Sequence, residues 1–260
     1  MAELDPILAA HAAELLERAR RGEITYTAFL TPAEQMALSH HLAFARDEWC
    51  FCGGYTAAER CRMVFLPPYL AELDEALRAE CLQESLADCL IALEIRGSGY
   101  RALTHRDFLG ALLHLGVERD RIGDLCAVAP DRCILICDRV LADFFCEHLT
   151  RVANDAVKLS QAVLPADFDG GRRFEKISDT VASPRADAVV AALANQSRER
   201  AQALFREGRV EIDYTPEERT DRTVGEGSVI VIRGCGKFII RALSDKTKKG
   251  RYRLLADKYI

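Results

Sequence analysis

The order of apolar segments between residues 89 and 163 is the sequence feature that most restricts the possible folds. Residues 89–95 (CLIALEI) have the composition of a buried strand, and residues 104–116 form a helical pattern that begins at Thr104 and ends at Gly116. The later segments are two strands around the turn Pro130-Asp131, a helix over 139–149 and a strand over 155–163. The resulting βαββαβ order predicts one sheet with both helices on one face, which is the ferredoxin-like arrangement.

The segments on either side of this pattern predict two further parts. Residues 1–72 are expected to form an N-terminal α/β module, whose second helix begins with the capping box Thr31-Pro32-Ala33-Glu34. The ferredoxin-like middle domain takes 73–165, and residues 166–180, rich in glycine, aspartate and charge, read as a linker.

Residues 181–260 are expected to form a C-terminal domain. The pair Ser183-Pro184 predicts the start of a helix over about 184–194, and a second helix begins at Ser197 and ends at Gly208. Strands follow at 210–213, 228–234 and 237–243. The chain as a whole is therefore predicted to be α+β.

Composition restricts the class of protein. With 49% hydrophobic and 29% charged residues in 260, the chain resembles an ordinary globular protein. No apolar run approaches the roughly 20 residues of a transmembrane helix, and the N-terminus lacks the charged-then-apolar order of a signal peptide. We therefore expect a cytoplasmic protein with no membrane partner.

The ten cysteines raise the alternatives of a metal site and of buried thiols. Cys50 and Cys52 are one residue apart, Cys133 and Cys137 three apart, and no two C-x-x-C pairs or zinc-finger histidine spacings occur. Most cysteines stand among Leu, Ile, Val and Phe, where a free thiol behaves as a small hydrophobe. Buried, reduced cysteines are the favoured interpretation, and no metal or other cofactor is expected.

Charge is distributed unevenly along the chain. The formal net charge is −5, yet residues 181–260 contain 16 Lys and Arg against 11 Asp and Glu. The other 180 residues therefore have a net charge of −10. A basic region on an acidic protein is the electrostatic pattern expected of a nucleic-acid binder.

The helix that begins at Ser197 concentrates this positive charge. Helical spacing places Arg198, Gln202 and Arg206 on one stripe, where arginines can bind successive phosphates in a bidentate manner. The alternative is a solvated face on which Glu199 and Glu207 pair with the arginines, and Arg200, which points elsewhere, is interpreted as ordinary surface.

A second basic run follows the last predicted strand. Lys246, Lys248, Lys249 and Arg251 belong to a stretch of eight residues with five positive charges and one tyrosine. Such a run is typical of a nucleic-acid surface, although lysines at a sheet edge also prevent aggregation.

The segments SRERAQALFREGRVEI and VGEGSVIVIRGCGKF resemble the RNA-binding domain named after small-subunit ribosomal protein four, here called the S-four domain. The resemblance covers about 60 residues and implies that a helix pair and the following strand hold an arginine-rich face against structured RNA. It implies RNA contacts for Arg185, Ser197, Arg198, Arg206, Arg209 and Lys237, with Gly208 at the turn. Gln202 and Arg233 complete the predicted surface together with the basic run. Ala186 departs from the usual leucine, and Asp213-Tyr214 from the frequent Asn-Gly.

Two further segments, GGYTAAERCRMVFLP (53–67) and LTHRDFLGALLHLGVERDRIGDL (103–125), are similar to the YlmH family of bacterial S-four proteins. This resemblance implies association with the ribosome or its large subunit through ribosomal or transfer RNA, in the rescue or quality control of stalled subunits. It implies no catalysis, and the sequence identifies no protein partner.

The sequence leaves two other function classes open. An RNA-modifying enzyme, either a pseudouridine synthase or a methyltransferase, is one alternative, and a cell-division interaction scaffold is the other. Residues 97–102 fit the pattern G-x-G-x-x-A, but the predicted helix begins only at Thr104, and the next two strands form a hairpin where a nucleotide fold needs a crossover. His105, Arg106 and Asp107 at the helix start are explained by anion binding or equally by helix capping.

Overall fold

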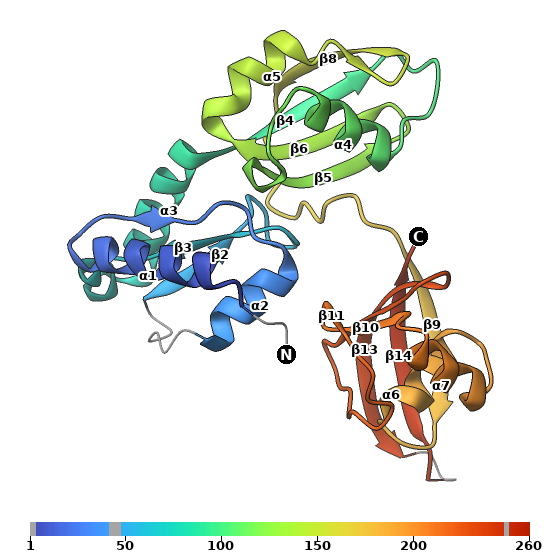
Figure 1. Ribbon diagram of the computed structural model, residues 1–260. Helices are drawn as coiled ribbons and strands as arrows, with labels where there is room; N and C mark the ends of the chain where they lie inside the picture. The colour runs from blue at the N-terminus through green and yellow to red at the C-terminus, as the bar shows by residue number, and fades with distance from the viewer. Residues whose placement is uncertain (1–3, 42–47, 247–249) are drawn as a thin grey trace. The chain divides into compact units, whose positions relative to one another are not determined.

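The computed structural model describes residues 4–41, 48–246 and 250–260 (Figure 1). The chain divides into two compact units, residues 2–171 and residues 172–260. The N-terminal and middle parts that the sequence separates therefore belong to one unit.

The first unit begins with a small α/β layer pair. Its helices are α1 (Pro6–Arg20) and α2 (Pro32–His41), and its strands β1 (Thr25–Tyr26), β2 (Trp49–Cys52) and β3 (Arg62–Phe65) form an antiparallel sheet in the order β1-β3-β2. The predicted capping box is present, since the Glu34 carboxylate accepts from the Thr31 backbone N–H at 2.6 Å. Leucine and alanine side chains of α1 pack against Met63 and Phe65 of β3.

A 3₁₀ turn, η1 (Pro68–Glu72), leads to α3 (Glu75–Cys89), a helix that the sequence analysis did not identify. The predicted boundary after residue 72 would assign α3 to the middle domain. The apolar side chains Cys81, Leu82 and Leu86 of α3 instead pack around Val64, Leu66 and Leu70. By its packing, α3 thus belongs with the N-terminal part, which extends to residue 89.

The rest of the first unit follows the predicted βαββαβ order. Its elements are β4 (Leu90–Gly97), α4 (His105–His114), β5 (Ile122–Ala129), β6 (Arg132–Asp138), α5 (Ala142–His148), a short β7 (Arg151–Val152) and β8 (Asp155–Gln161). Short 3₁₀ turns, η2 (Arg119–Arg121) and η3 (Arg139–Leu141), precede β5 and α5. The sheet is antiparallel in the order β5-β6-β4-β8-β7. Phe108, Leu112 and Phe145 of the two helices pack against Leu93, Ile95 and Leu135 on one face of this sheet.

Buried polar groups join the two parts of the first unit. The Asp124 carboxylate of β5 accepts hydrogen bonds from the Tyr55 hydroxyl at 2.6 Å and from the backbone N–H groups of Glu59 and Arg60 at 2.7 and 2.9 Å. Arg62 of β3, only 3% exposed, forms an ion pair with Asp138 of β6. Because a buried charge is costly without a partner, these contacts fix the N-terminal part on the sheet.

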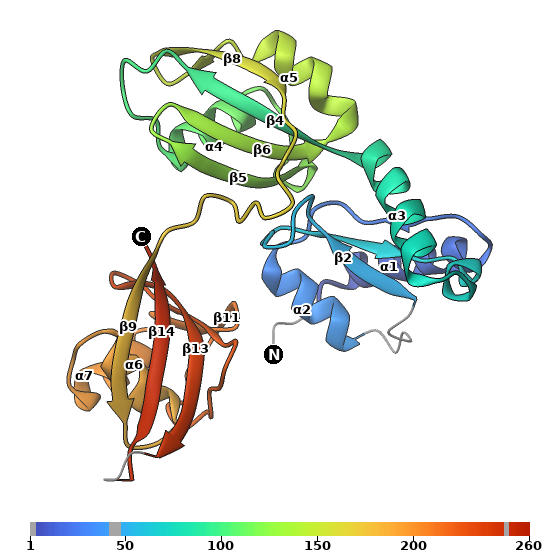
Figure 2. The ribbon, with the colours of Figure 1, turned by 180° about the vertical axis from the view of Figure 1, so that it is seen from behind.

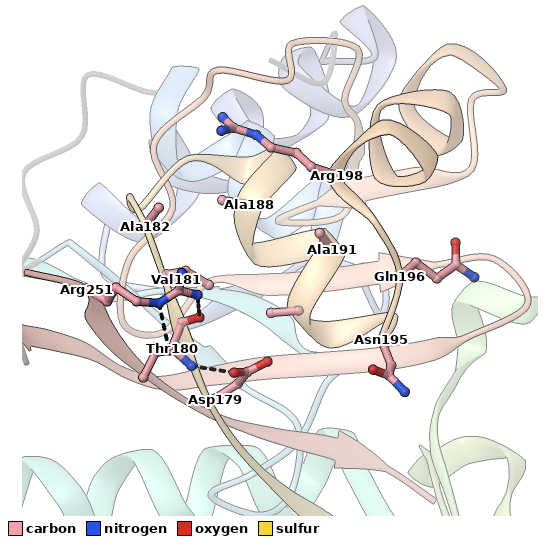
Figure 3. A pocket seen from close by; sticks show the side chains of 11 residues that line it. Asp179, Thr180, Val181, Ala182, Ala188, Ala191, Asn195, Gln196, Arg198 and Arg251 are labelled. Atoms are coloured by element: carbon pink, nitrogen blue, oxygen red, sulfur yellow. Dashed lines mark hydrogen bonds between the residues drawn. The ribbon is translucent and has the colours of Figure 1, made fainter. Parts of the chain in front are cut away.

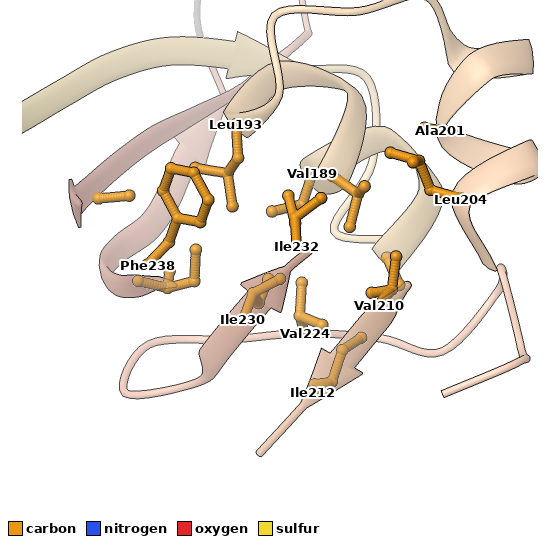
Figure 4. Packing of buried hydrophobic residues seen from close by; sticks show 14 of the residues in the cluster. Val189, Leu193, Ala201, Leu204, Val210, Ile212, Val224, Ile230, Ile232 and Phe238 are labelled. Carbon is orange, nitrogen blue, oxygen red and sulfur yellow. The ribbon is translucent and has the colours of Figure 1, made fainter. Parts of the chain in front are cut away.

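The C-terminal unit is a six-stranded antiparallel sheet with two helices. Its elements are β9 (Phe174–Val181), α6 (Ala186–Leu193), α7 (Arg198–Arg206), β10 (Val210–Ile212), β11 (Thr215–Pro216), β12 (Val229–Ile232), β13 (Gly236–Lys246) and β14 (Tyr252–Tyr259). The strand order is β11-β10-β12-β13-β14-β9. Val189, Leu193, Leu204 and Phe205 of the helices pack against Ile230, Ile232 and Phe238 of the sheet (Figure 4).

One prediction for this unit was wrong and one needs a correction. Residues 174–180, expected to be linker, belong to β9, which pairs with β14 along its whole length. The helix expected over about 184–194 is present, but it begins at Ala186, with Arg185 at the N-cap position and no side-chain cap.

Candidate nucleic-acid interface

Helix α7 orients the predicted arginine stripe. The Ser197 hydroxyl accepts from the Arg200 backbone N–H at 3.2 Å and so caps the helix, while Gly208 at φ 63° provides the left-handed turn that ends it. Leu204 and Phe205 are buried, whereas Arg206 is exposed. Ser197 therefore has a structural role beside any RNA contact.

Asp187 on α6 draws together three of the predicted residues. Its side chain is completely buried and accepts from Nε and Nη2 of Arg198 at 3.0 Å each. Nε and Nη2 of Arg185 donate to it at 3.3 Å, and so does the Gln202 side-chain amide. We call Asp187, Arg185, Arg198 and Gln202 the Asp187 cluster.

The cluster leaves part of each arginine exposed. The side chains of Arg185 and Arg198 are 42% and 49% exposed. Both use the Nε edge for Asp187, and within the described residues the Nη1 group of each has no acceptor. A guanidinium held along one edge in this way is ordered in advance for an anion on its other edge.

The charge state of Asp187 depends on these partners. Burial by itself raises the pKa of the Asp187 carboxyl, but hydrogen bonds from Arg185, Gln202 and Arg198 outweigh it and hold the pKa below its ordinary value of 3.8. Asp187 is therefore ionised near neutral pH and keeps both arginines in place.

The remaining arginines of α7 and its exit turn have different surroundings. Arg200 pairs with Glu207 at 3.0 Å, which agrees with its interpretation as ordinary surface. Arg209 donates to the Arg233 backbone carbonyl at 2.6 Å and also pairs with Glu207. Arg206 is exposed, and no described carboxylate lies within ion-pair distance of it. On α7, Arg206 is thus the cation most available to a ligand.

The strands contribute Arg233 and Lys237. Arg233 is exposed and pairs with Glu211 at 3.1 Å. The Lys237 ammonium lies 5.1 Å from the centre of the Tyr214 ring and 4.7 Å from that of Tyr259. Asp213 and Tyr214 both have positive φ, so this turn keeps the left-handed conformation that Asn-Gly would favour. Lys237 is therefore half-buried between aromatic rings and less available than its sequence position suggests.

The basic run is only partly described. Lys248 and Lys249 lie outside the described residues, and Lys246 ends β13, but its side chain is also outside the description. Arg251 donates from Nε to the Thr180 hydroxyl at 2.9 Å and from Nη2 to the Thr180 carbonyl at 2.5 Å. It lines a groove of about 350 Å³ between β9 and the alanine-rich side of α6, which Arg198 also lines (Figure 3).

Sequence reasoning missed Asp187, although a signal was present. The segment ADAVVAAL is an apolar helix with one carboxylate, and an unpaired carboxylate would not be buried on such a helix. That carboxylate required cationic partners, and Arg198, eleven residues later, was the nearest arginine after Arg185.

The rejected nucleotide motif has a structural explanation in the first unit. Ser98 donates through its backbone N–H at 3.0 Å and through its hydroxyl at 2.5 Å to the buried carboxylate of Asp155. Thr104 and Asp107 form a reciprocal capping box at the start of α4, which favours capping over anion binding at this helix. The hairpin of β5 and β6 follows, as expected.

Neither a candidate metal site nor a membrane-spanning helix occurs in the described residues. No group of three or more His, Cys, Asp or Glu side chains there could hold a metal ion, and the ten cysteines are free thiols. No helix within residues 4–41, 48–246 and 250–260 has the length and apolar character needed to cross a membrane.

Comparison with known proteins identifies relatives. Residues 90–165 match the family model described as "Putative RNA-binding domain in YlmH". The chain is 31% identical over 232 residues to "Ribosome-associated protein quality control protein P2" of Bacillus subtilis. The aligned region covers 89% of this chain and 86% of that protein. Among solved structures, "Cell division protein ylmH from Streptococcus pneumoniae" matches with a TM-score of 0.47 and 16% identity, over 63% of this chain and 95% of that one. The identity to the Bacillus protein over nearly the whole chain shows that this protein belongs to the YlmH family.

Proposed function

We propose that this protein is a non-catalytic RNA-binding protein and that its C-terminal unit is an S-four-type domain. The observation that carries the proposal is the Asp187 cluster, in which one buried carboxylate holds Arg185 and Arg198 with their outer edges exposed. Arg206 adds an exposed cation on the same helix as Arg198. The net charge of residues 181–260 supports an anionic partner.

RNA is the polyanion that best suits this surface. Guanidinium groups bind phosphates in a bidentate manner, and pre-ordered side chains lose less entropy when a ligand binds. The printed name of the Bacillus relative refers to ribosome-associated quality control. On that ground we propose ribosomal or transfer RNA on the ribosome, in particular on its large subunit, as the partner.

Cosedimentation of the full chain with purified large ribosomal subunits tests the proposal. We expect Arg206→Glu to weaken binding by about tenfold or more, because it removes a charged contact and adds a repulsive one. Arg200→Glu is the matched control, since Arg200 is on the same helix but pairs with Glu207. Arg198→Glu is unsuitable because it would place a second carboxylate beside buried Asp187.

Salt dependence gives a second measurement of the same interface. With about six phosphate contacts, affinity should fall on the order of a thousandfold between about 50 and 200 mM salt. Equal binding by wild type and Arg206→Glu, or affinity that is insensitive to salt, would contradict an RNA-binding role for this face.

A further inference from the structure

Three cations stand side by side on the sheet of the first unit. Arg96 at the end of β4 is directly opposite Arg132 of β6 on one side and Lys158 of β8 on the other. Residues directly opposite each other in antiparallel strands point to the same face of the sheet. Arg132, Arg96 and Lys158 therefore form a row across three strands, which we call the sheet row.

This arrangement places like charges side by side in the sheet. Like charges directly opposite each other destabilise a sheet. Glu94 is the one described carboxylate that pairs with the row, at 3.0 Å from Arg96 and 3.5 Å from Arg132. The side chains of Arg96 and Arg132 remain 59% and 43% exposed, Lys158 is exposed, and Nε of Arg132 is buried with no hydrogen-bond partner. An excess of positive charge is thus held at one place by the strand register.

A hollow with a mixed polar and apolar lining adjoins the row. It has a volume of about 340 Å³, with Glu94 and Arg132 among its polar lining and Val128, Ile134 and Phe168 among its apolar lining. This face of the sheet is the one opposite α4 (Figure 2). Phe29 and Tyr55 of the N-terminal part cover another portion of this face, and residues 161–165 together with Phe168 form one wall of the hollow. The hollow therefore lies between the segment that follows β8 and the strands that bear Glu94 and Arg132.

The loop after β4 adds an aromatic ring at the same end of the sheet. Its backbone is fixed by the bonds from Ser98 to Asp155 and by the bond from the Leu103 N–H to the Pro130 carbonyl at 2.7 Å. Tyr100 on this loop is 94% exposed. A ring with this exposure buries little of its surface in the fold and is accessible for stacking on an unpaired base.

We propose that the sheet row and the adjoining hollow bind an unpaired segment of RNA. The proposal rests on the proposed function only in taking RNA as the ligand. Neighbouring strands are about 4.8 Å apart, so long side chains on three successive strands can follow successive phosphates of one strand. The hollow lies within the size range of ligand sites and accepts one base, with Arg132 and Glu94 as its polar contacts. Cations on a sheet face with an exposed aromatic side chain on a loop at the same end of the sheet favour single-stranded over duplex RNA.

The test uses the full chain and a short fluorescent oligouridylate as the probe. Arg96→Gln and Lys158→Gln are combined, and affinity is measured by anisotropy across a salt series. We expect the slope of log affinity against log salt to become shallower by about 0.7 for each cation removed. Tyr100→Ala should weaken binding by about tenfold through lost stacking. Arg106→Gln is the matched control, because it removes an exposed cation from α4 in the same domain.

The outcomes separate this site from the C-terminal one. Loss of oligouridylate binding in the sheet-row variant but not in Arg206→Glu supports the sheet row, whatever the fate of the C-terminal proposal. The sheet row is overturned if the sheet-row variant and Tyr100→Ala both keep the wild-type salt slope and affinity while Arg206→Glu loses binding. The C-terminal proposal would then still stand. The sheet-row variant is also tested against an oligoglutamate peptide. If its salt slope for RNA is unchanged while it loses an oligoglutamate binding that the wild type shows, the row binds an acidic protein segment and the proposal is overturned.

Discussion

The Asp187 cluster and the sheet row are two ways of presenting cations on a protein surface. In the cluster, one buried carboxylate holds two arginines at 3.0 to 3.3 Å. In the row, Arg96 and Arg132 share Glu94 at the edge of a hollow, and no described carboxylate lies within ion-pair distance of Lys158. In the cluster, the Asp187 carboxylate offsets part of the positive charge and fixes the positions of the arginines. In the row, more of the positive charge is left unpaired, and the strand register sets the positions of the cations. The number of basic residues in a segment therefore indicates a positively charged surface. It does not indicate how many of those charges are available to a ligand.

The largest effect on stability is expected from Asp187→Ala. The substitution removes the acceptor of charged hydrogen bonds from both arginines, and we expect the free energy of unfolding of the C-terminal unit to fall by about 2–3 kcal/mol. Amide hydrogen exchange in β10 and β12 measures this unit separately from the first. If exchange there is unaltered, the cluster is not a structural anchor, and the comparison with the sheet row fails.

A smaller effect is expected from acid. The pKa of Asp187 is lowered in the folded protein, so its contribution to stability is fully present above 3.8 and disappears as the pH falls through the lowered folded value. Hydrogen exchange of the C-terminal unit as a function of pH measures this loss, with Asp187→Asn as the control. The same acid dependence in wild type and Asp187→Asn would show that other carboxylates cause it.

The smallest effect on stability is expected from Lys158→Gln in the sheet row. The substitution removes like-charge repulsion with Arg96. The free energy of unfolding should therefore change by less than about 0.5 kcal/mol, and any change should be a rise. Urea unfolding followed by the fluorescence of Trp49, which is in the same unit, measures this. A loss above about 1 kcal/mol would give the row a structural role and weaken its assignment to a ligand.

Much of the fold was predictable from local signals. The capping box at Thr31, the cap at Thr104, the stop at Gly116 and the order of apolar segments predicted α2, α4 and the βαββαβ order of the first unit. Strand β9 was missed because its segment FEKISDTV is an edge strand with mostly exposed or half-buried charged and polar side chains. Helix α3 was missed because Cys89 is its one buried residue, which leaves little hydrophobic periodicity to read.

The candidate site was predictable in part. The stripe of α7 follows from helical spacing, and the structure agrees with it for Arg198 and Gln202, which meet at Asp187. Lys237, by contrast, lies between two tyrosines that are far from it in the sequence. Arg96, Arg132 and Lys158 are 26 to 62 residues apart, and only the strand register brings them side by side. Contacts of this kind depend on pairing between strands, which spacing along one segment does not encode.

The pairing of β9 with β14 has a consequence for how the C-terminal unit folds. Phe174 is opposite Tyr259, so this ladder joins strands that are separated by nearly the whole unit, with α6, α7 and four more strands between them. Such distant pairing forms slowly compared with contacts between neighbouring segments. The Asp187 cluster, by contrast, spans only residues 185–202. We therefore expect the arginine-bearing helix pair to assemble before the sheet beneath it is closed, an order that pulse-labelled hydrogen exchange during refolding would reveal.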